Sequence, residues 1–484
     1  MIKGGKQIVV SDKEILSMDA TTLGNKIANQ EITSVYATKT YIAHLKKVNS
    51  KINCLVEDRF DEALKEAENA DKEIKQNGVG HKKLFGVPIS MKESFDVVGM
   101  KTTGGLLHLK DAIGKKDAEV VARLKAEGAI ILGKTNTPAL CFCQETDNKL
   151  YGRTNNPWDL TKTSGGSSGG EAALLAIGGA AAGIGSDIGG SIRFPSHFNG
   201  VIGFKSGNRQ VSQDGSFPQA DIPLEERMLG IGPMTKSVQD ANMMYNIIAK
   251  QPAPRRDLTN FTMTILPRMN YPMSDETEAM LTMVQKQMED EFNTLREVPP
   301  FFDQSALLWQ EMMSIDGGQG MAEITFANNK RKEFREYIKE IFTGKSDVHR
   351  YLSWALIGAY LFKPSEKRVL EINSLIAQGD KKLDDYLDER ILIFPVYHTG
   401  ALKHGRVYKE IFSIRKTFLK YMPYVAYANV WGLPSLTIPI QTDKQNLPIS
   451  VQLMSKNGNE DALFQLGEWL ESRNRGYVRC PKYD

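Results

Sequence analysis

The chain has 484 residues, of which 41% are hydrophobic and 25% are charged. This is an ordinary globular balance, which argues against disordered, collagen-like and coiled-coil proteins. The formal net charge of +3 provides no strong basic field for a nucleic acid, and a chain of this length predicts roughly three domains.

Cysteine usage and the apolar stretches favour a soluble protein in a reducing compartment. Four cysteines are too few for a disulfide framework in so long a chain. Cys141 and Cys143 form a C-x-C pair, but no second pair or suitably spaced histidine completes a zinc site. The N-terminus lacks an apolar signal peptide, and the longest apolar stretches, 172–184 and 351–362, are too short to span a bilayer. We therefore expect a cytoplasmic protein with no transmembrane segment, no metal and no nucleic-acid partner.

Hydrophobic periodicity in the first part of the chain predicts alternating helices and strands. A helix capped by Ser34 is expected to bury one apolar face. A buried strand is expected over 84–91, and it runs directly into Lys92. A helix capped by Asp117 and a short apolar strand over 129–132 follow. This alternation predicts an α/β core.

The region from about 301 to 390 differs from the rest of the chain. It is rich in Trp, Met, Phe and Lys at helical spacing, with few strand signals. Strand patterns return at 391–396, 433–439 and 447–454. Because the core pattern resumes after the helical region, we interpret 301–390 as an insertion that covers the substrate pocket of one continuous domain, residues 1–484. The length-based expectation of three domains then gives way to a single domain.

Two short motifs match known nucleotide-binding and hydrolase patterns. Residues 128–135 fit the P-loop pattern, but the sequence predicts a helix before them and a strand within them, whereas a P-loop needs the opposite order. Residues 165–169 fit the G-x-S-x-G elbow of α/β hydrolases. The preceding residues 158–164 are polar rather than an apolar strand, yet His398 and His404 follow in the required order. A histidine-dependent α/β hydrolase using this serine therefore stays open as an alternative.

Glycine is concentrated where most of the chemically interesting side chains lie. Thirteen of the 41 glycines fall between Gly165 and Gly207. Two glycine-flanked serine loops, 164–170 and 185–191, are joined by a small apolar segment that predicts a tightly packed helix. Glycine permits close backbone approach, and successive amides of the second loop can point at one site, as an oxyanion hole requires. Buried hydroxyls without partners cost free energy, which favours a functional interpretation over simple packing.

The combined pattern resembles the amidase signature family. The resemblance rests on the glycine-rich stretch together with GVPISMKE (86–93), GKTN (133–136) and NPW (156–158), and it extends over about 30–250 and 390–484. It implies an α/β fold with one mixed, twisted β-sheet covered by helices on both faces. It also implies a serine hydrolase that cleaves linear carboxamides and needs no cofactor.

The resemblance further implies a catalytic triad without histidine. By position Lys92 matches the family's lysine base, Ser167 the bridging serine in a cis peptide, and Ser191 the nucleophile. A free lysine is a poor base at neutral pH, but burial on an apolar strand favours its neutral form. Lys92 would then accept the Ser191 proton through Ser167, and Ser191 would form an acyl-enzyme.

The same resemblance implies supporting roles for the residues around the triad. The expected oxyanion hole consists of the backbone amides of Ile188, Gly189, Gly190 and Ser191. The expected supporting residues are Ser168, Asp187 and Arg193, of which the two charged ones can fix the loop geometry through hydrogen bonds. Cys141 lies after a turn that approaches the substrate in relatives, so it is a candidate substrate contact, although a small buried thiol is an equally good interpretation.

Within the family, the motifs are closer to the fatty-acid amide hydrolase branch than to the A subunit of glutamyl-tRNA amidotransferase. Residues 206–218 lack the Tyr-Gly-Arg stretch usual in the amidotransferase. The hydrolase branch is favoured by GGE (169–171), SDIGGSIR (186–193), FNGVIGFK (198–205) and residues 475–483. We expect a small-molecule amide as partner, with long-chain N-acyl amides as candidate substrates. An amidotransferase A-subunit-like protein stays open as an alternative, and so does a homodimer.

The resemblance to the fatty-acid amide hydrolase branch suggests a role for the helical region 301–390. Apolar faces over 307–313 and 354–361 are suited to line an acyl channel, although ordinary helix core is the preferred interpretation. Ser164 and Ser206 stand where family members often have proline, and both are turn positions outside the triad.

Overall fold

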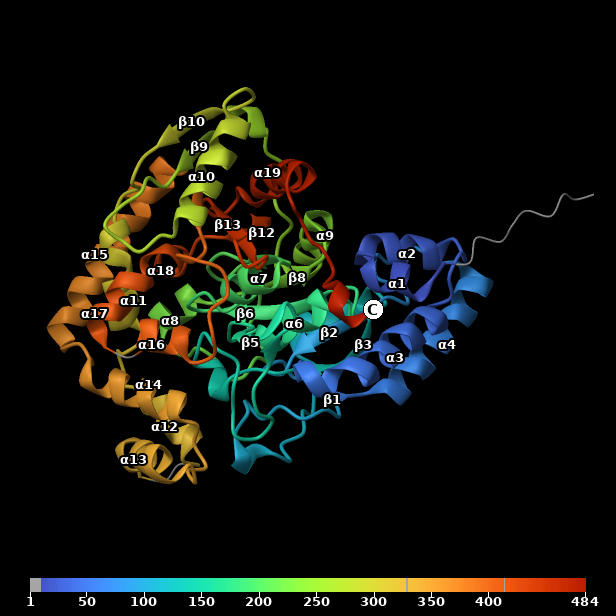
Figure 1. Cartoon of the computed structure of the whole chain (residues 1–484), viewed down its shortest axis with the longest axis horizontal. Helices are drawn as coiled ribbons and strands as arrows, with labels where there is room; N and C mark the ends of the chain where they lie inside the picture. Colours follow the sequence, from blue (N-terminus) through green and yellow to red (C-terminus); the bar gives the residue numbers. More distant parts are fainter. Residues whose placement is uncertain (1–9, 328–329, 413) are drawn as a thin grey trace, which may run out of the picture.

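The computed structural model describes residues 10–327, 330–412 and 414–484. Its centre is an 11-stranded mixed sheet with the strand order β1-β3-β2-β6-β8-β7-β12-β13-β11-β9-β10 (Figure 1). The strands of this sheet are β1 (Leu55–Asp58), β2 (Pro88–Lys92), β3 (Ile130–Thr135), β6 (Gly183–Asp187), β7 (Ile202–Lys205), β8 (Gly230–Thr235), β9 (Thr262–Ile265), β10 (Asn293–Arg296), β11 (Arg390–Pro395), β12 (Ser435–Thr442) and β13 (Pro448–Met454). A separate hairpin pairs β4 (Asn155–Asn156) with β5 (Asp159–Thr163).

Helices connect the strands along the whole chain. In the first half they are α1 (Asp12–Ser17), α2 (Ala20–Ala28), α3 (Ser34–Ile52), α4 (Phe60–Asn77), α5 (Glu119–Ala126), α6 (Gly169–Ala176), α7 (Arg193–Asn199), α8 (Pro223–Met228), α9 (Val238–Ile248) and α10 (Asp275–Met288). In the second half they are α11 (Phe302–Met312), α12 (Gln319–Thr325), α13 (Glu333–Thr343), α14 (Arg350–Leu361), α15 (Glu366–Tyr386), α16 (Arg406–Phe412), α17 (Arg415–Tyr421), α18 (Pro423–Val430) and α19 (Glu460–Arg473).

Helices cover both faces of the sheet, as the resemblance implied. On β7, the ring of Phe204 lies 4.8 Å from that of Tyr245 on α9 and 4.7 Å from that of Phe464 on α19. The neighbouring residue Gly203 points to the opposite face, because side chains alternate along a strand. There a Cβ on Gly203 would meet Ser196 of α7. The β7 strand is therefore packed between α9 and α19 on one face and α7 on the other.

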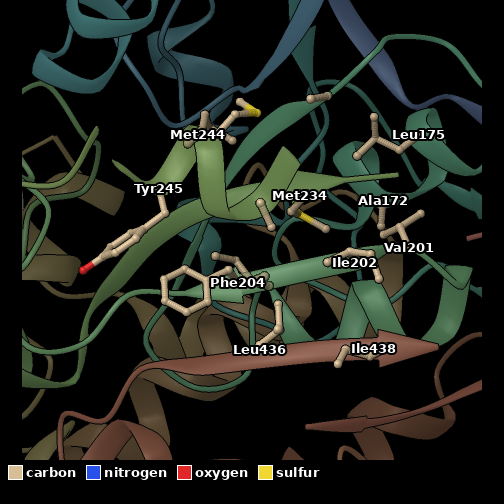
Figure 2. Close-up of a cluster of buried hydrophobic side chains, with 14 of the residues drawn as sticks. Ala172, Leu175, Val201, Ile202, Phe204, Met234, Met244, Tyr245, Leu436 and Ile438 are labelled. Carbon is tan, nitrogen blue, oxygen red and sulfur yellow. The ribbon is translucent and has the colours of Figure 1, made fainter. Parts of the chain in front are cut away.

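A large apolar core lies between the sheet and these helices. Figure 2 shows part of it, where Phe204 and Leu436 come from the neighbouring strands β7 and β12 and Met244 comes from α9. All three side chains are fully buried. The helix α6 joins the two serine loops, and every one of its residues is buried. The small apolar segment predicted from the sequence is thus a helix enclosed by the core.

Two helix starts differ from the prediction by one residue. Thr33, not Ser34, caps α3, with its side chain accepting from the amide of Tyr36. Ser34 Oγ instead donates to the carbonyl of Gly86, 2.6 Å away. Ala118, not Asp117, precedes α5, and the Asp117 carboxylate accepts from the amide of Val98 at 2.8 Å. In both cases a tertiary contact takes the side chain that local patterning would use as a cap.

The P-loop match is a strand, as its sequence indicated. The Gly-Lys-Thr part of the motif, 133–135, lies inside β3. The Lys134 side chain is buried and donates to the hydroxyl of Thr102 at 2.8 Å. The Lys134 ammonium group is therefore hydrogen-bonded inside the protein and does not serve as a phosphate ligand.

The described residues between β10 and β11 form the helices α11 to α15. Both flanking strands lie at one edge of the sheet, where β9 pairs in parallel with each of them. Figure 1 shows α12, α13 and α14 together at one corner of the molecule. The helical character of 301–390 is confirmed, whereas its role as an insertion in one domain stays a prediction. No helix in the described parts of the chain has both the length and the apolar character needed to cross a membrane.

Candidate active site

Strand topology brings the lysine and the serine loops together. Strands β2 and β6 are parallel neighbours, with Met91 opposite Ile184. Their carboxyl ends therefore lie at the same edge of the sheet, which is where sites form in α/β proteins. Lys92 is the last residue of β2, and Ser191 follows the end of β6 by four residues.

Lys92 is fully buried at this edge. Its Nζ donates to Ser167 Oγ at 2.6 Å and to Ser186 Oγ at 2.9 Å. Burial lowers the pKa of Lys92 because the ammonium form loses its hydration, and contact with the Cys141 thiol partly offsets this effect. At a given pH, a larger fraction of Lys92 is therefore in the neutral amine form than for a solvated lysine.

Ser167 lies in the loop before α6, where the Gly166–Ser167 peptide bond is cis. This loop is packed so closely that a Cβ on Gly166 would lie 2.5 Å from the carbonyl oxygen of Cys143. The Ser168 amide donates to the Ser191 carbonyl at 3.0 Å, so the two serine loops are joined directly. Ser168 thus supports the geometry through its backbone, while its own hydroxyl is 3.4 Å from the carbonyl of Ser186.

Asp187 and Arg193 form a buried ion pair that closes the second loop. Arg193 Nε lies 3.0 Å from Asp187 Oδ2, and both side chains are fully buried. Burial alone would raise the pKa of Asp187, but Arg193 and further hydrogen bonds outweigh it and lower that pKa below its ordinary value. The Asp187 carboxylate also accepts from the amides of Gly190 and Ile192, at 2.8 and 3.1 Å. Hydrogen bonds among the loop's own residues therefore fix the backbone that carries Ser191.

The structure leaves three of the four expected oxyanion amides available. The Gly190 amide is used by Asp187, which corrects its assignment to the oxyanion hole. Within the described chain, the amides of Ile188, Gly189 and Ser191 have no hydrogen-bond acceptor. Free amides beside a serine hydroxyl are the donors that a developing oxyanion requires.

Two residues that the sequence did not single out for this purpose hold the carbonyls of this loop, and the first of them orients the available amide of Gly189. Trp309 Nε1 donates to the Ile188 carbonyl at 2.7 Å. Gln144 Nε2 donates to the Gly189 carbonyl at 2.9 Å. Because the carbonyl and the amide of a trans peptide point in opposite directions, each bond also sets the direction of the next residue's N–H. Nothing near the glycine loops in sequence marks either residue, since both contacts are tertiary.

Ser191 opens into a small cavity of about 60 Å³, which Ser167, Ser186 and Cys141 also line. The Ser191 hydroxyl makes no hydrogen bond with any described residue, Ser167 included. Cys141 lies 3.2 Å from the Thr137 hydroxyl. The structure therefore brings both serines and the cysteine to one cavity, with Lys92 hydrogen-bonded to Ser167 and Ser186 of its wall.

Two further polar residues belong to this arrangement. Ser186 Oγ is the second hydrogen-bond acceptor of Lys92 Nζ. In the sequence, only its position in the SDIGGSIR motif indicates that it belongs to the site. Glu171 on α6 is fully buried, accepts from Ser90 and from the Thr135 hydroxyl at 2.8 Å, and has its pKa raised to about 7 by burial. Its carboxylate favours the protonated form of Lys92 and so opposes the effect of burial there.

The histidines required by the α/β-hydrolase alternative lie elsewhere. His398 Nε2 is 2.9 Å from Glu410 Oε2, and His404 Nε2 is 3.1 Å from the Leu160 carbonyl. Neither lines the serine cavity. The G-x-S-x-G serine Ser167 has Lys92 as its partner, which contradicts a histidine-dependent mechanism.

An apolar cavity of about 280 Å³ adjoins the serine cavity. The two share Phe142 and Met313 in their walls. The larger one is lined mainly by apolar side chains of α11, α14, α16 and α17, among them Trp309, Trp354, Leu361, Phe412 and Phe418. The helical region thus provides an apolar space next to Ser191.

Comparison with known proteins identifies the family of the chain. The chain is 32% identical to fatty-acid amide hydrolase 2-B of Danio rerio, over 96% of this chain and 91% of that protein. It is 27% identical to the A subunit of glutamyl-tRNA(Gln) amidotransferase from Geotalea daltonii, over 96% of this chain and 99% of the other. The solved structure of a fatty acid amide hydrolase superposes with a TM-score of 0.80 at 22% identity, covering 97% of this chain and 87% of the other. The amidase family profile matches residues 36–464, and the chain therefore belongs to the amidase family, whose members are hydrolases of amide C–N bonds.

Proposed function

We propose that the protein hydrolyses linear carboxamides with Ser191 as nucleophile and Lys92 as base, acting through Ser167. The observation that carries this proposal is the 2.6 Å contact between Nζ of the fully buried Lys92 and Oγ of Ser167, which lines the same cavity as Ser191. Burial supplies the neutral amine, and the shared cavity places both hydroxyls within reach of one substrate.

The reaction then proceeds in two halves. Ser191 Oγ attacks the amide carbonyl as its proton passes to Ser167, whose own proton passes to Lys92. The oxyanion is stabilised by the amides of Ile188, Gly189 and Ser191. The C–N bond breaks as the proton returns along the same route to the departing amine. Water next attacks the acyl ester, regenerates Ser191 and releases the carboxylic acid.

We further infer that the acyl part is a long alkyl chain. The support for this is the apolar cavity of about 280 Å³ that shares Phe142 and Met313 with the wall of the serine cavity. Each methylene group buried there contributes about 0.8 kcal/mol. The similarity to fatty-acid amide hydrolase 2-B agrees with such a substrate. The cytoplasm is the proposed compartment, supported by the fact that the four cysteines are unpaired.

A labelling and turnover experiment tests the nucleophile. Replacing Ser191 with Ala is expected to reduce amide turnover by about 10⁴-fold or more and to abolish labelling by a fluorophosphonate probe. In the wild-type protein, mass spectrometry should locate the probe on Ser191. Hydrolysis at the wild-type rate by the Ser191→Ala protein would contradict the proposal.

A panel of amides tests the substrate. Amides from acetamide to oleamide, with amino-acid amides included, should show kcat/KM rising with acyl length. Strict dependence on glutamine and on two co-purifying subunits would instead favour the amidotransferase alternative.

A further inference from the structure

One carboxyl group in the serine cavity has no partner. Glu225, on α8, is 9% exposed and lines the same cavity as Ser191 and Ser167. Among the described residues its side chain has no hydrogen bond and no ion pair. A buried polar group without a partner is destabilising, so its presence in a reactive cavity needs a functional reason.

Among the described residues, no cation pairs with Glu225 or lowers its pKa. Burial, followed by the nearby carboxylates of Asp316 and Asp221, raises the pKa of Glu225 to about 8. The cations close to it along the chain are already paired. Arg227 Nη1 donates to Asp380 at 2.9 Å, and Arg209 Nε donates to the neighbouring Glu226 at 2.9 Å.

The serine cavity adjoins two different spaces. On one side it shares Phe142 and Met313 with the apolar cavity. On another it shares Gln219 and Leu229 with a polar hollow, which Glu226 also lines. When an acyl chain occupies the apolar cavity, the amine half of the amide is left for the rest of the serine cavity, whose wall includes Glu225.

We propose that Glu225 is a specificity-determining residue that binds a cationic group on the leaving amine, so that the preferred substrates are N-acylated diamines. The inference rests on the proposed hydrolysis at Ser191. An ammonium group placed beside this carboxyl makes a charge-assisted hydrogen bond and supplies the counter-charge that the protein lacks. Hydrolysis would release a fatty acid and a free diamine.

Two isosteric substrates isolate this interaction. N-octanoyl-1,3-diaminopropane and N-octanoylbutylamine have the same acyl chain and differ in having an ammonium or a methyl group at the end of the amine. For the wild-type protein, kcat/KM should be about tenfold to a hundredfold higher for the cationic substrate, the range expected for a hydrogen bond to a charged group. Glu225→Gln should bring the ratio to about one while hydrolysis of the neutral amide continues.

Glu226→Gln is the matched control, because Glu226 is the next residue of the same helix and its carboxylate is already paired with Arg209. This variant should keep the wild-type ratio. Because the ratio compares two substrates on one enzyme preparation, a partial loss of folded protein does not alter it.

The pH dependence of the ratio provides a second readout. Glu225 is largely protonated at pH 7 and largely ionised at pH 9, whereas the substrate ammonium stays charged. The ratio should therefore rise between pH 7 and 9 in the wild-type protein and stay flat in Glu225→Gln. Asp221 and Asp316 are the carboxylates close to Glu225 and are the same for both substrates, and the titration of Lys92 affects both substrates equally.

The possible failures are distinguishable. Equal kcat/KM for the two substrates, with activity still lost in Ser191→Ala, would overturn the role of Glu225 and leave the proposed function intact. The butylamide of 8-aminooctanoic acid carries its ammonium group on the acyl half. If kcat/KM is higher for this substrate than for N-octanoylbutylamine, and Glu225→Gln removes the difference, the assignment of the cation to the leaving amine is overturned. Full hydrolysis by Ser191→Ala would overturn both proposals.

Discussion

The indole Nε1 of Trp309 donates a hydrogen bond to the Ile188 carbonyl at 2.7 Å. The two residues are 121 positions apart in the chain. Trp309 belongs to α11 in the helical region, whereas Ile188 begins the loop that ends in Ser191. The helical region is therefore bonded directly to the backbone that would stabilise an oxyanion.

Trp309→Phe keeps an aromatic ring and removes this donor. We expect kcat for a short-chain amide to fall by about tenfold with little change in KM, because the Gly189 amide loses its fixed direction. The loss should be smaller than the 10²–10³-fold that removal of a whole oxyanion donor causes. Steady-state kinetics with butyramide measure the effect without involving the apolar cavity.

Trp469→Phe is the control for this substitution. Trp469 Nε1 donates to Glu291 at 2.7 Å on the surface, so the same chemical change occurs away from the site. Its kcat should stay within about twofold of wild type. An unchanged kcat in Trp309→Phe would show that the loop keeps its direction without the indole.

Glu171→Gln tests how the Glu171 carboxylate affects the pKa of Lys92. Lys92 acts only when neutral, so kcat/KM should fall as the pH drops below its lowered pKa. The Glu171 carboxylate favours the protonated lysine, and its own pKa of about 7 makes it largely ionised in the alkaline range. Its replacement by the amide should therefore move the midpoint of the pH–rate profile to lower pH. A midpoint that moves to higher pH would contradict this account of Lys92.

The catalytic candidates could be found from sequence because each lies in a short motif with unusual composition. Polar residues such as Lys92, Ser167 and Ser191 stand out among buried apolar residues and glycines. The α/β class followed from the alternation of strand and helix patterns, and β2 and β3 are indeed fully buried strands. In these cases a local pattern carries the structural information.

Where sequence patterns give the wrong geometry or none, contacts that form only in the folded chain decide it. The pairing of Gly190 with Asp187 depends on how the loop closes around Arg193. Glu225 looks like an ordinary helix-surface glutamate, because only the folded chain shows that it lines the serine cavity. No periodicity or spacing rule reports such contacts.

Asp187→Asn should strongly destabilise the fold. Arg193 would remain fully buried without its counter-charge, which costs about 3–5 kcal/mol. Urea unfolding at pH 7 measures this loss. Since the pKa of Asp187 is lowered in the folded state, its stabilisation is present above the unfolded pKa of about 3.9 and is lost as the pH falls through the folded value. The difference between wild type and variant should therefore narrow in strong acid.

The exposed pair between Arg123 and Glu119 provides the comparison for that prediction. Its atoms lie 2.7 Å apart, but each side chain is about a third exposed to solvent. Glu119→Gln should lower the free energy of unfolding by less than about 1 kcal/mol. An equally small loss in Asp187→Asn would show that the buried pair is not required for the loop.

Gly358→Leu should shorten the acyl chain that the protein accepts. Gly358 lies in α14 and lines the apolar cavity, and a Cβ built there meets no atom within 4 Å. The Cβ of a larger side chain therefore has room there, and leucine also has a higher helix propensity than glycine, by about 1 kcal/mol. The expected result is a fall of about tenfold or more in kcat/KM for oleamide, an intermediate effect for Gly358→Ala, and no change for butyramide. A uniform fall across all chain lengths would mean that the cavity does not hold the acyl chain.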